Sequence, residues 1–318
     1  MTTPLLHGDK LTCFTAALAG ALTARGDQRW WRPLLSEGPY LAVAPAEGEL
    51  LRFEHHSAPP LPSLGLRVAG SDDWDTAYTA LAEQISRSGA VVLLADYFNL
   101  PWQRAHGRLH GTHWLAVVDH GDGWVIEDPL EFATDLGQQP GSRIQVPDPV
   151  ELRSWATALG EHHLPSTLRE QAMAGERDIA RTRTYRWLET DPDPLLSPAP
   201  EGRLVGKDAL LALAARYRFA SAPADFAQND DLWQALRQRE TLLWAARHDP
   251  EALDEGGRAH WERAVARWQA LTPLLLHARM RAEHGGTVNT GLIAETLTEL
   301  ADFEDEHLAY GARRTKGD

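Results

Sequence analysis

The sequence HWLAVVDHGDGWVIED, residues 113–128, contains two apolar segments separated by a polar, glycine-rich turn. This pattern predicts two strands joined in a hairpin. Pairing Val117 with Trp124 across the turn fixes the register. In that register His113 lies opposite Asp128. Since directly opposed residues have Cβ atoms about 4.5–5.5 Å apart, we expect the Asp128 carboxylate to hold one imidazole nitrogen of His113. A register shift of one residue would break this contact.

Other segments extend the hairpin into a domain. One run, AVVLLA, is apolar at every position, which is typical of a strand buried on both faces. Strand signals stop after about residue 150, and residues 206–310 have the pattern of about four helical segments. We therefore predict the α+β fold class, with one α+β domain over residues 1–160 and a helical accessory region over residues 161–318. The expected elements of the first domain are strands at 90–95, 114–118, 124–127 and 143–146, and helices at 12–25 and 74–87.

The single cysteine of the chain, Cys13, is predicted to lie in the first turn of the first helix, with Thr12 as the N-cap. Backbone amides and the helix dipole favour negative charge at that place, which lowers the pKa of a thiol and makes it a better nucleophile. The alternative is a buried thiol that only fills space in the core.

Cysteine, histidine and aspartate follow one another along the chain in the order of a papain-like catalytic triad. The thiol of Cys13 is on the first helix, while His113 and Asp128 are on the sheet. In this interpretation His113 is the base and Asp128 orients it. A transglutaminase-like core, which has the same order, is the alternative fold. His106 and His110 are rival candidates for the base, but they precede the strand rather than lie on it.

An oxyanion donor is also needed, and His7 is the candidate. It lies six residues before Cys13, where papain-like enzymes commonly have a glutamine that donates to the oxyanion. Lys10 is a second candidate for this part. A terminal histidine without a catalytic role is the alternative interpretation of His7.

Composition restricts the class of partner and the compartment. The chain has 318 residues and a formal net charge of -14, which argues against nucleic acid as a partner because phosphate binding needs a basic surface. It contains no apolar run of membrane-spanning length and no visible secretory signal. With a single cysteine, these features favour a reducing, cytoplasmic setting. No P-loop, GxGxxG or CxxC motif predicts a cofactor or metal site.

Three segments resemble one protein family. VVLLADYFNLPW at residues 91–102, the sequence from His113 to Pro129, and Ser36-Glu37-Gly38 are similar to motifs of the butirosin biosynthesis protein H-like N-terminal domain family. The resemblance covers about residues 7–160 and extends more loosely into the helical region. Two departures concern the turn, which is Asp-His-Gly-Asp here instead of a Gly-Tyr-Asp type, and Thr112, where the family often has glycine or alanine.

The resemblance implies a papain-like cysteine acyltransferase of natural-product (antibiotic) biosynthesis. Such an enzyme takes an acyl group from an acyl or peptidyl carrier protein and passes it to an amine of a small-molecule acceptor, or to a nucleophile within the acyl chain. Carried over by motif, Cys13 is the nucleophile, His113 the base and Asp128 the orienting carboxylate. The enzyme needs no cofactor of its own, because the phosphopantetheine arrives on the carrier protein. Basic residues on helices 206–219 and 258–281 are candidates for receiving it. A thioesterase or peptidase with the same triad, and a binding module without catalysis, remain the alternatives.

Overall fold

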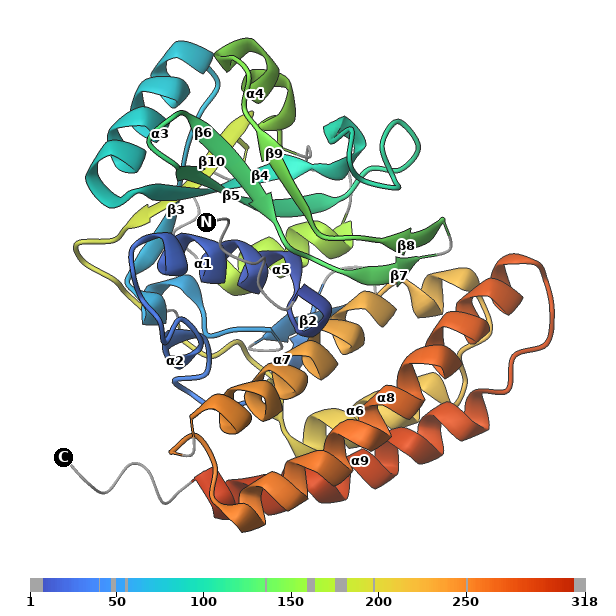
Figure 1. Cartoon of the computed structure of the whole chain (residues 1–318). Helices are drawn as coiled ribbons and strands as arrows, with labels where there is room; N and C mark the ends of the chain where they lie inside the picture. Colours follow the sequence, from blue (N-terminus) through green and yellow to red (C-terminus); the bar gives the residue numbers. More distant parts are fainter. Residues whose placement is uncertain are drawn as a thin grey trace. The chain divides into compact units, whose positions relative to one another are not determined.

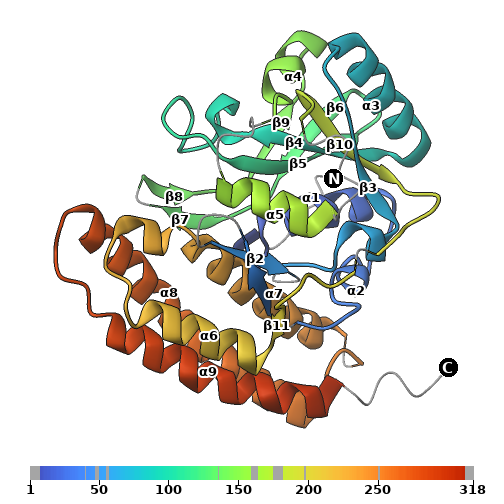
Figure 2. The ribbon, with the colours of Figure 1, turned by 180° about the vertical axis from the view of Figure 1, so that it is seen from behind.

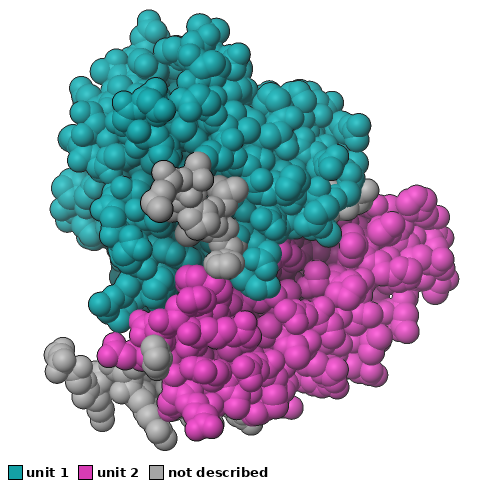
Figure 3. All heavy atoms as spheres, viewed as in Figure 1, with its two compact units in different colours: residues 1–36, 59–197 teal, residues 37–58, 198–318 magenta. Residues whose placement is uncertain are grey.

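The structure is a computed structural model of mixed helices and strands, and it forms two compact units (Figure 3). The first unit comprises residues 1–36 and 59–197, and the second comprises residues 37–58 and 198–318. The residues that the structure describes are 8–39, 41–46, 50–54, 57–134, 136–158, 164–174, 182–196, 198–249 and 251–311. His7, the predicted oxyanion donor, lies outside them.

The units divide the chain differently from the predicted boundary at residue 160. The first unit extends to residue 197, because strand β10 (Tyr185–Thr190) is inserted in its sheet between β3 (Leu66–Ser71) and β4 (Ala90–Asp96). The prediction that strands end near residue 150 is therefore wrong. An early segment, residues 37–58, belongs to the second unit.

The first unit is built on a six-stranded antiparallel sheet (Figure 1). Every residue of β4 is buried, as the continuous apolar run predicts. The strand order is β3-β10-β4-β5-β6-β9, where β5 is Thr112–Asp119, β6 is Trp124–Asp128 and β9 is Ser142–Gln145. All four predicted strands of this domain are present.

Helices cover both faces of this sheet (Figures 1 and 2). Helix α3 (Trp74–Ser88) packs its apolar side on the face that carries Leu115 and Val117. Helix α1 (Cys13–Ala24) packs on the opposite face. A Cβ on Gly20 would lie 3.2 Å from the Cβ of Ala116, so this glycine permits an unusually close approach of α1 to the sheet. This close approach sets the position of α1 on the sheet, and with it the place where the first turn of α1 meets β5.

The predicted register of the hairpin is wrong by two residues. Val117 pairs with Ile126, and Asp119 pairs with Trp124, so the connecting loop is one residue shorter than the predicted five. A shift of two residues keeps every side chain on its face of the sheet, whereas a shift of one exchanges the faces. His113 and Asp128 consequently become diagonal neighbours on one face instead of directly opposed residues, which is still within reach of long side chains.

Shorter elements complete the first unit. They are η1 (Gly8–Lys10), α2 (Trp31–Leu34), η3 (Leu61–Leu64), η4 (Tyr97–Asn99), the β7–β8 hairpin (Phe132–Thr134 and Gly137–Gln139), α4 (Pro149–Trp155) and α5 (Leu164–Ala174).

The second unit consists of a small sheet and long helices. The strands β1 (Ala42–Pro45), β2 (Leu51–Glu54) and β11 (Leu204–Val205) form the sheet, with β1 between the other two. This pairing of segments that lie far apart in the chain was not predicted from the sequence. The helices are α6 (Lys207–Tyr217), α7 (Asn229–His248), α8 (Glu255–Glu283) and α9 (Thr290–Gly311), with the short η5 (Pro223–Phe226) between α6 and α7. The four predicted helical segments are thus present. Among the described residues, no helix combines the length and the apolar character that crossing a membrane requires.

A buried ion pair joins two of these helices. The guanidinium of Arg239, on α7, donates through Nε to Glu304 Oε1 on α9 at 2.8 Å, and both side chains are almost fully buried. The guanidinium also lies over the ring of Trp268, 4.7 Å from its centroid. A buried charge without its partner is strongly unfavourable, so each of the two residues depends on the other.

We expect Arg239→Met to lower the free energy of unfolding by about 3–5 kcal/mol, because it leaves the Glu304 carboxylate buried and unpaired. The double variant Arg239→Met/Glu304→Met should recover most of the loss, because it removes both charges. Equilibrium unfolding in urea measures both effects. A double variant as unstable as the single one would contradict this account of the pair.

Candidate active site

Cys13 is the first residue of α1, and the start of this helix is held by a capping box. The Thr15 N–H donates to Thr12 Oγ1 at 3.2 Å, and the Thr12 N–H donates to Thr15 Oγ1 at 2.8 Å. The predicted N-cap is confirmed. Among the described residues, no acceptor takes the backbone N–H of Cys13 or of Phe14. Two amide donors of the first turn are therefore available next to the thiol.

The segment before α1 is tied to the end of β6. The Glu131 N–H donates to the Gly8 carbonyl at 3.2 Å. A Cβ on Gly8 would lie 1.4 Å from the carbonyl oxygen of Pro129, so only glycine permits this contact. Because Pro129 directly follows Asp128, this contact couples the position of the thiol to that of the carboxylate.

The thiol reaches His113 where β5 and β6 separate. Their ladder ends at the pair Ala116–Glu127, so the first residues of β5 have no partner on β6. The side chain of His113 and the backbone N–H of Trp114, which lies beyond the end of the ladder, both lower the pKa of the Cys13 thiol. Cys13, the first residue of α1, therefore lies next to His113 at this end of the hairpin.

His113 lies between the thiol and the carboxylate. Its Nε2 donates to Asp128 Oδ2 at 2.9 Å, and the two side chains are 4% and 2% exposed. Since Nε2 is directed at Asp128, Nδ1 is the ring nitrogen left to face Cys13. The three residues predicted from the sequence are brought together in the order thiol, imidazole, carboxylate.

The surroundings favour the charged forms of both the thiol and the imidazole. Burial alone would lower the pKa of His113, but the charge and hydrogen bond of Asp128, helped by Cys13, raise it to about 10. Burial alone would raise the pKa of Cys13, but the hydrogen bond and charge of His113 and the Trp114 N–H outweigh it, so the pKa lies below the ordinary value for a thiol. Cys13 is nevertheless partly exposed. The arrangement favours a thiolate–imidazolium pair.

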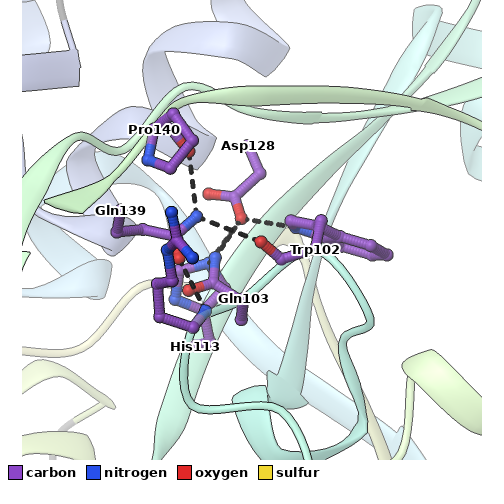
Figure 4. A network of polar contacts seen from close by, with 7 residues as sticks. Trp102, Gln103, His113, Asp128, Gln139 and Pro140 are labelled. Atoms are coloured by element: carbon purple, nitrogen blue, oxygen red, sulfur yellow. Dashed lines mark hydrogen bonds and ion pairs between the residues drawn. The ribbon is translucent and has the colours of Figure 1, made fainter. Parts of the chain in front are cut away.

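Two further residues converge on the carboxylate (Figure 4). The Trp102 indole Nε1 donates to Asp128 Oδ2 at 2.8 Å, and the Gln103 amide Nε2 donates to the same oxygen at 2.6 Å. With His113, three N–H groups surround one carboxylate oxygen. Hydrogen bonds of this kind are what allow a carboxylate to be buried.

Trp102 and Gln103 belong to the loop of residues 97–111, which connects β4 to β5. Its two ends are closed by Asp96, whose Oδ1 accepts the N–H groups of Phe98 and Gly111, both at 3.0 Å. His110 Nδ1 lies 2.5 Å from Asp96 Oδ2, and its ring stacks on Phe98. His110 therefore pairs with Asp96, whereas His113 is the histidine in contact with Cys13.

Sequence patterns did not predict Gln103 or Gln139 as members of the site, and Trp102 entered only as the last residue of the segment 91–102. Gln139 is 1% exposed, and its Oε1 accepts the Arg104 N–H at 2.8 Å. The recognised motif ends at Trp102, which pointed to this loop but not to Asp128 as its target. Among the described residues, no group of three His, Cys, Asp or Glu side chains is arranged to hold a metal ion.

Comparison with known proteins adds no assignment. No protein-family model matches the chain, and no curated protein matches it at a significant level. The resemblance to the butirosin biosynthesis protein H-like N-terminal domain family therefore stays a prediction, supported by the three segments quoted above.

We expect iodoacetamide to alkylate Cys13 faster than free cysteine at pH 6, where a thiol of ordinary pKa, about 8.5, is almost fully protonated. The pair remains thiolate–imidazolium between the lowered pKa of Cys13 and about pH 10, where His113 loses its proton. Below that range the thiolate takes up a proton and the reaction slows. Intact mass over time measures the rate.

His113→Ala should slow this alkylation at pH 6, because the imidazolium no longer stabilises the thiolate. His120→Ala is the matched control, since His120 lies in the turn at the other end of β5 and its Nε2 is 3.7 Å from Glu127. A wild-type rate at pH 6 no greater than that of free cysteine would favour a structural thiol.

Proposed function

We propose that this chain is a cysteine-dependent acyltransferase or offloading enzyme of natural-product biosynthesis. Cys13 takes an acyl group from the thioester of an acyl or peptidyl carrier protein and passes it to an amine or to a nucleophile within the acyl chain. One observation carries the proposal. Cys13, a partly exposed residue at a helix N-terminus, lies next to His113, whose Nε2 donates to the buried Asp128 carboxylate at 2.9 Å.

In the first half-reaction the Cys13 thiolate attacks the thioester carbonyl and forms a C–S bond. The resulting oxyanion lies near the N–H groups of Cys13 and Phe14, the two donors that the capping box leaves available. Collapse breaks the bond to the phosphopantetheine sulfur. This leaving thiolate takes the proton from His113, which becomes neutral, and the acyl group remains on Cys13 as a thioester.

In the second half-reaction an amine attacks the acyl-Cys13 carbonyl, and neutral His113 accepts the proton that the amine loses. The bond to the Cys13 sulfur breaks, and the thiolate–imidazolium pair is restored. Asp128 keeps its hydrogen bond to Nε2 throughout, so the proton is exchanged at Nδ1. If water takes the place of the amine, the same residues perform hydrolysis, as in a thioesterase or peptidase.

The papain-like fold is part of the proposal. It is supported by a helix that begins at the nucleophile and packs on an antiparallel sheet whose strands carry His113 and Asp128. The motifs at residues 91–102 and 113–129 support the family assignment. We also retain the reducing, cytoplasmic setting, in which a single reactive thiol stays reduced.

The carrier protein is the proposed partner, and the basic residues of the helical unit contribute less to its binding than their number suggests. Arg267 pairs with Glu299, Arg279 lies 3.9 Å from Glu283, and Lys207 lies 3.9 Å from Asp302. These carboxylates offset the positive charge. We therefore place recognition of the carrier arm near Cys13 rather than on the helices α6 and α8.

Incubation with acyl-carrier thioesters should add the mass of the acyl group to the wild-type chain and not to Cys13→Ala. Intact mass spectrometry measures the adduct, and adding an amine or only water shows which nucleophile removes it. Loss of the adduct in water at the rate seen with amines would identify a hydrolase. An unmodified wild-type chain with every thioester tested would contradict the proposal.

We expect His113→Ala to slow acylation at least about a thousandfold, since removing one member of a triad removes most of its benefit. Asp128→Asn should cost less, because the amide oxygen still accepts hydrogen bonds while its lost charge no longer supports the imidazolium. Initial rates of acylation measure both. If His110→Ala is more damaging than His113→Ala, the assignment of the base is incorrect.

A further inference from the structure

Asp128 is held by two consecutive residues of one loop. Trp102 Nε1 and Gln103 Nε2 donate to the same atom, Oδ2, at 2.8 and 2.6 Å, and this is also the atom that accepts the His113 hydrogen bond. Gln103 is 6% exposed, and its Nε2 lies 3.3 Å from His113 Nε2. Both nitrogens are donors, and both point to the oxygen between them.

Gln103 is itself fixed by a second buried glutamine. The Gln139 amide accepts the N–H of Arg104 at 2.8 Å and donates to the carbonyl of Trp102 at 3.3 Å (Figure 4). Its Nε2 also donates to the Pro140 carbonyl at 2.9 Å. The backbone on both sides of Gln103 is therefore bonded to one side chain of β8. A side chain so supported has little freedom to leave Asp128.

We propose that Gln103 is a positioning residue for the chemistry of Cys13 and His113. Its side-chain amide holds Asp128 Oδ2 at the place from which the carboxylate orients the imidazole toward the thiol. This inference rests on the proposed function for its catalytic meaning. The orientation of His113 next to a thiolate, however, is tested without any acyl donor.

The neutral charge of the donor is essential to this role. A lysine or arginine in place of Gln103 would also hold the carboxylate, but its positive charge would offset that of Asp128 and weaken the support of the His113 imidazolium. An amide and an indole N–H fix the position of Oδ2 and leave the charge in place. Asp128 then both orients the His113 ring and stabilises its positive charge.

Gln103 is not placed to act as the oxyanion donor that a glutamine commonly supplies in papain-like enzymes. Its amide is next to Nε2 of His113, and we assign the other ring nitrogen, Nδ1, to the thiol because Nε2 is taken by Asp128. The imidazole therefore separates Gln103 from the carbonyl that Cys13 attacks. Its contribution passes through Asp128 and His113.

The test compares the pH profiles of Cys13 alkylation by iodoacetamide in the wild type, Gln103→Met and Gln145→Met. Methionine keeps the length of the side chain and removes the donor. Gln145 is an exposed glutamine at the end of β9, so it provides the same chemical change away from the site. Thermal unfolding is recorded for each protein.

We expect the midpoint of the Gln103→Met profile to move to higher pH by about one unit, so that the rate at pH values below the wild-type midpoint falls about tenfold. Gln145→Met should retain the wild-type profile. If Gln103→Met does not fold, Gln103→Asn takes its place. The shorter side chain keeps an amide but withdraws it from Oδ2, and the same shift is expected.

An unchanged profile, or a rate lowered equally at every pH, would overturn the positioning role, since a purely structural residue affects stability without affecting the ionisation of Cys13. The outcome is independent of the acylation experiment. If carrier thioesters never modify Cys13, the proposed function fails, yet the alkylation profiles still decide the role of Gln103.

Discussion

The hydrogen bond from His113 Nε2 to Asp128 Oδ2 is the interaction on which the rest of the site depends. It fixes which ring nitrogen faces the thiol, and it supplies the charge that keeps the imidazole protonated. The bond is buried, so it exists only if both of its ends are held by other groups. The loop of residues 97–111 holds the carboxylate from one side. The contact of Gly8 with Pro129 and Glu131 holds the start of α1 beside it.

Much of this arrangement follows from local sequence patterns. The apolar run of β4, the hairpin of β5 and β6, and the N-cap of α1 are each determined by a few neighbouring residues, and all three predictions are confirmed. The pairing of His113 with Asp128 was also predicted, although the register was wrong by two residues. The predicted contact is still present because side chains along a strand alternate between the two faces of the sheet. A register shift of two residues therefore keeps His113 and Asp128 on the same face.

Other features depend on contacts between distant residues and left no local signal. Strand β10 is a short segment, and its strand conformation depends on pairing with β3 on one side and β4 on the other. Gln103 and Gln139 have the composition of ordinary loop and strand residues, and 36 positions separate them in the sequence. Their role arises from hydrogen bonds that the folded chain creates. A buried glutamine cannot be distinguished from an exposed one by its neighbours in sequence alone.

The charges of the site explain why the supporting donors among the described residues are neutral. With a thiolate, an imidazolium and a carboxylate, the three side chains carry one net negative charge in a largely buried place. A nearby cation would neutralise that charge, but it would also compete with His113 for the carboxylate or for the thiolate. Backbone N–H groups, an indole and an amide stabilise negative charge through their dipoles and take no part in the exchange of protons. The proton that leaves the imidazolium can then move only between His113, the sulfur and the reacting groups.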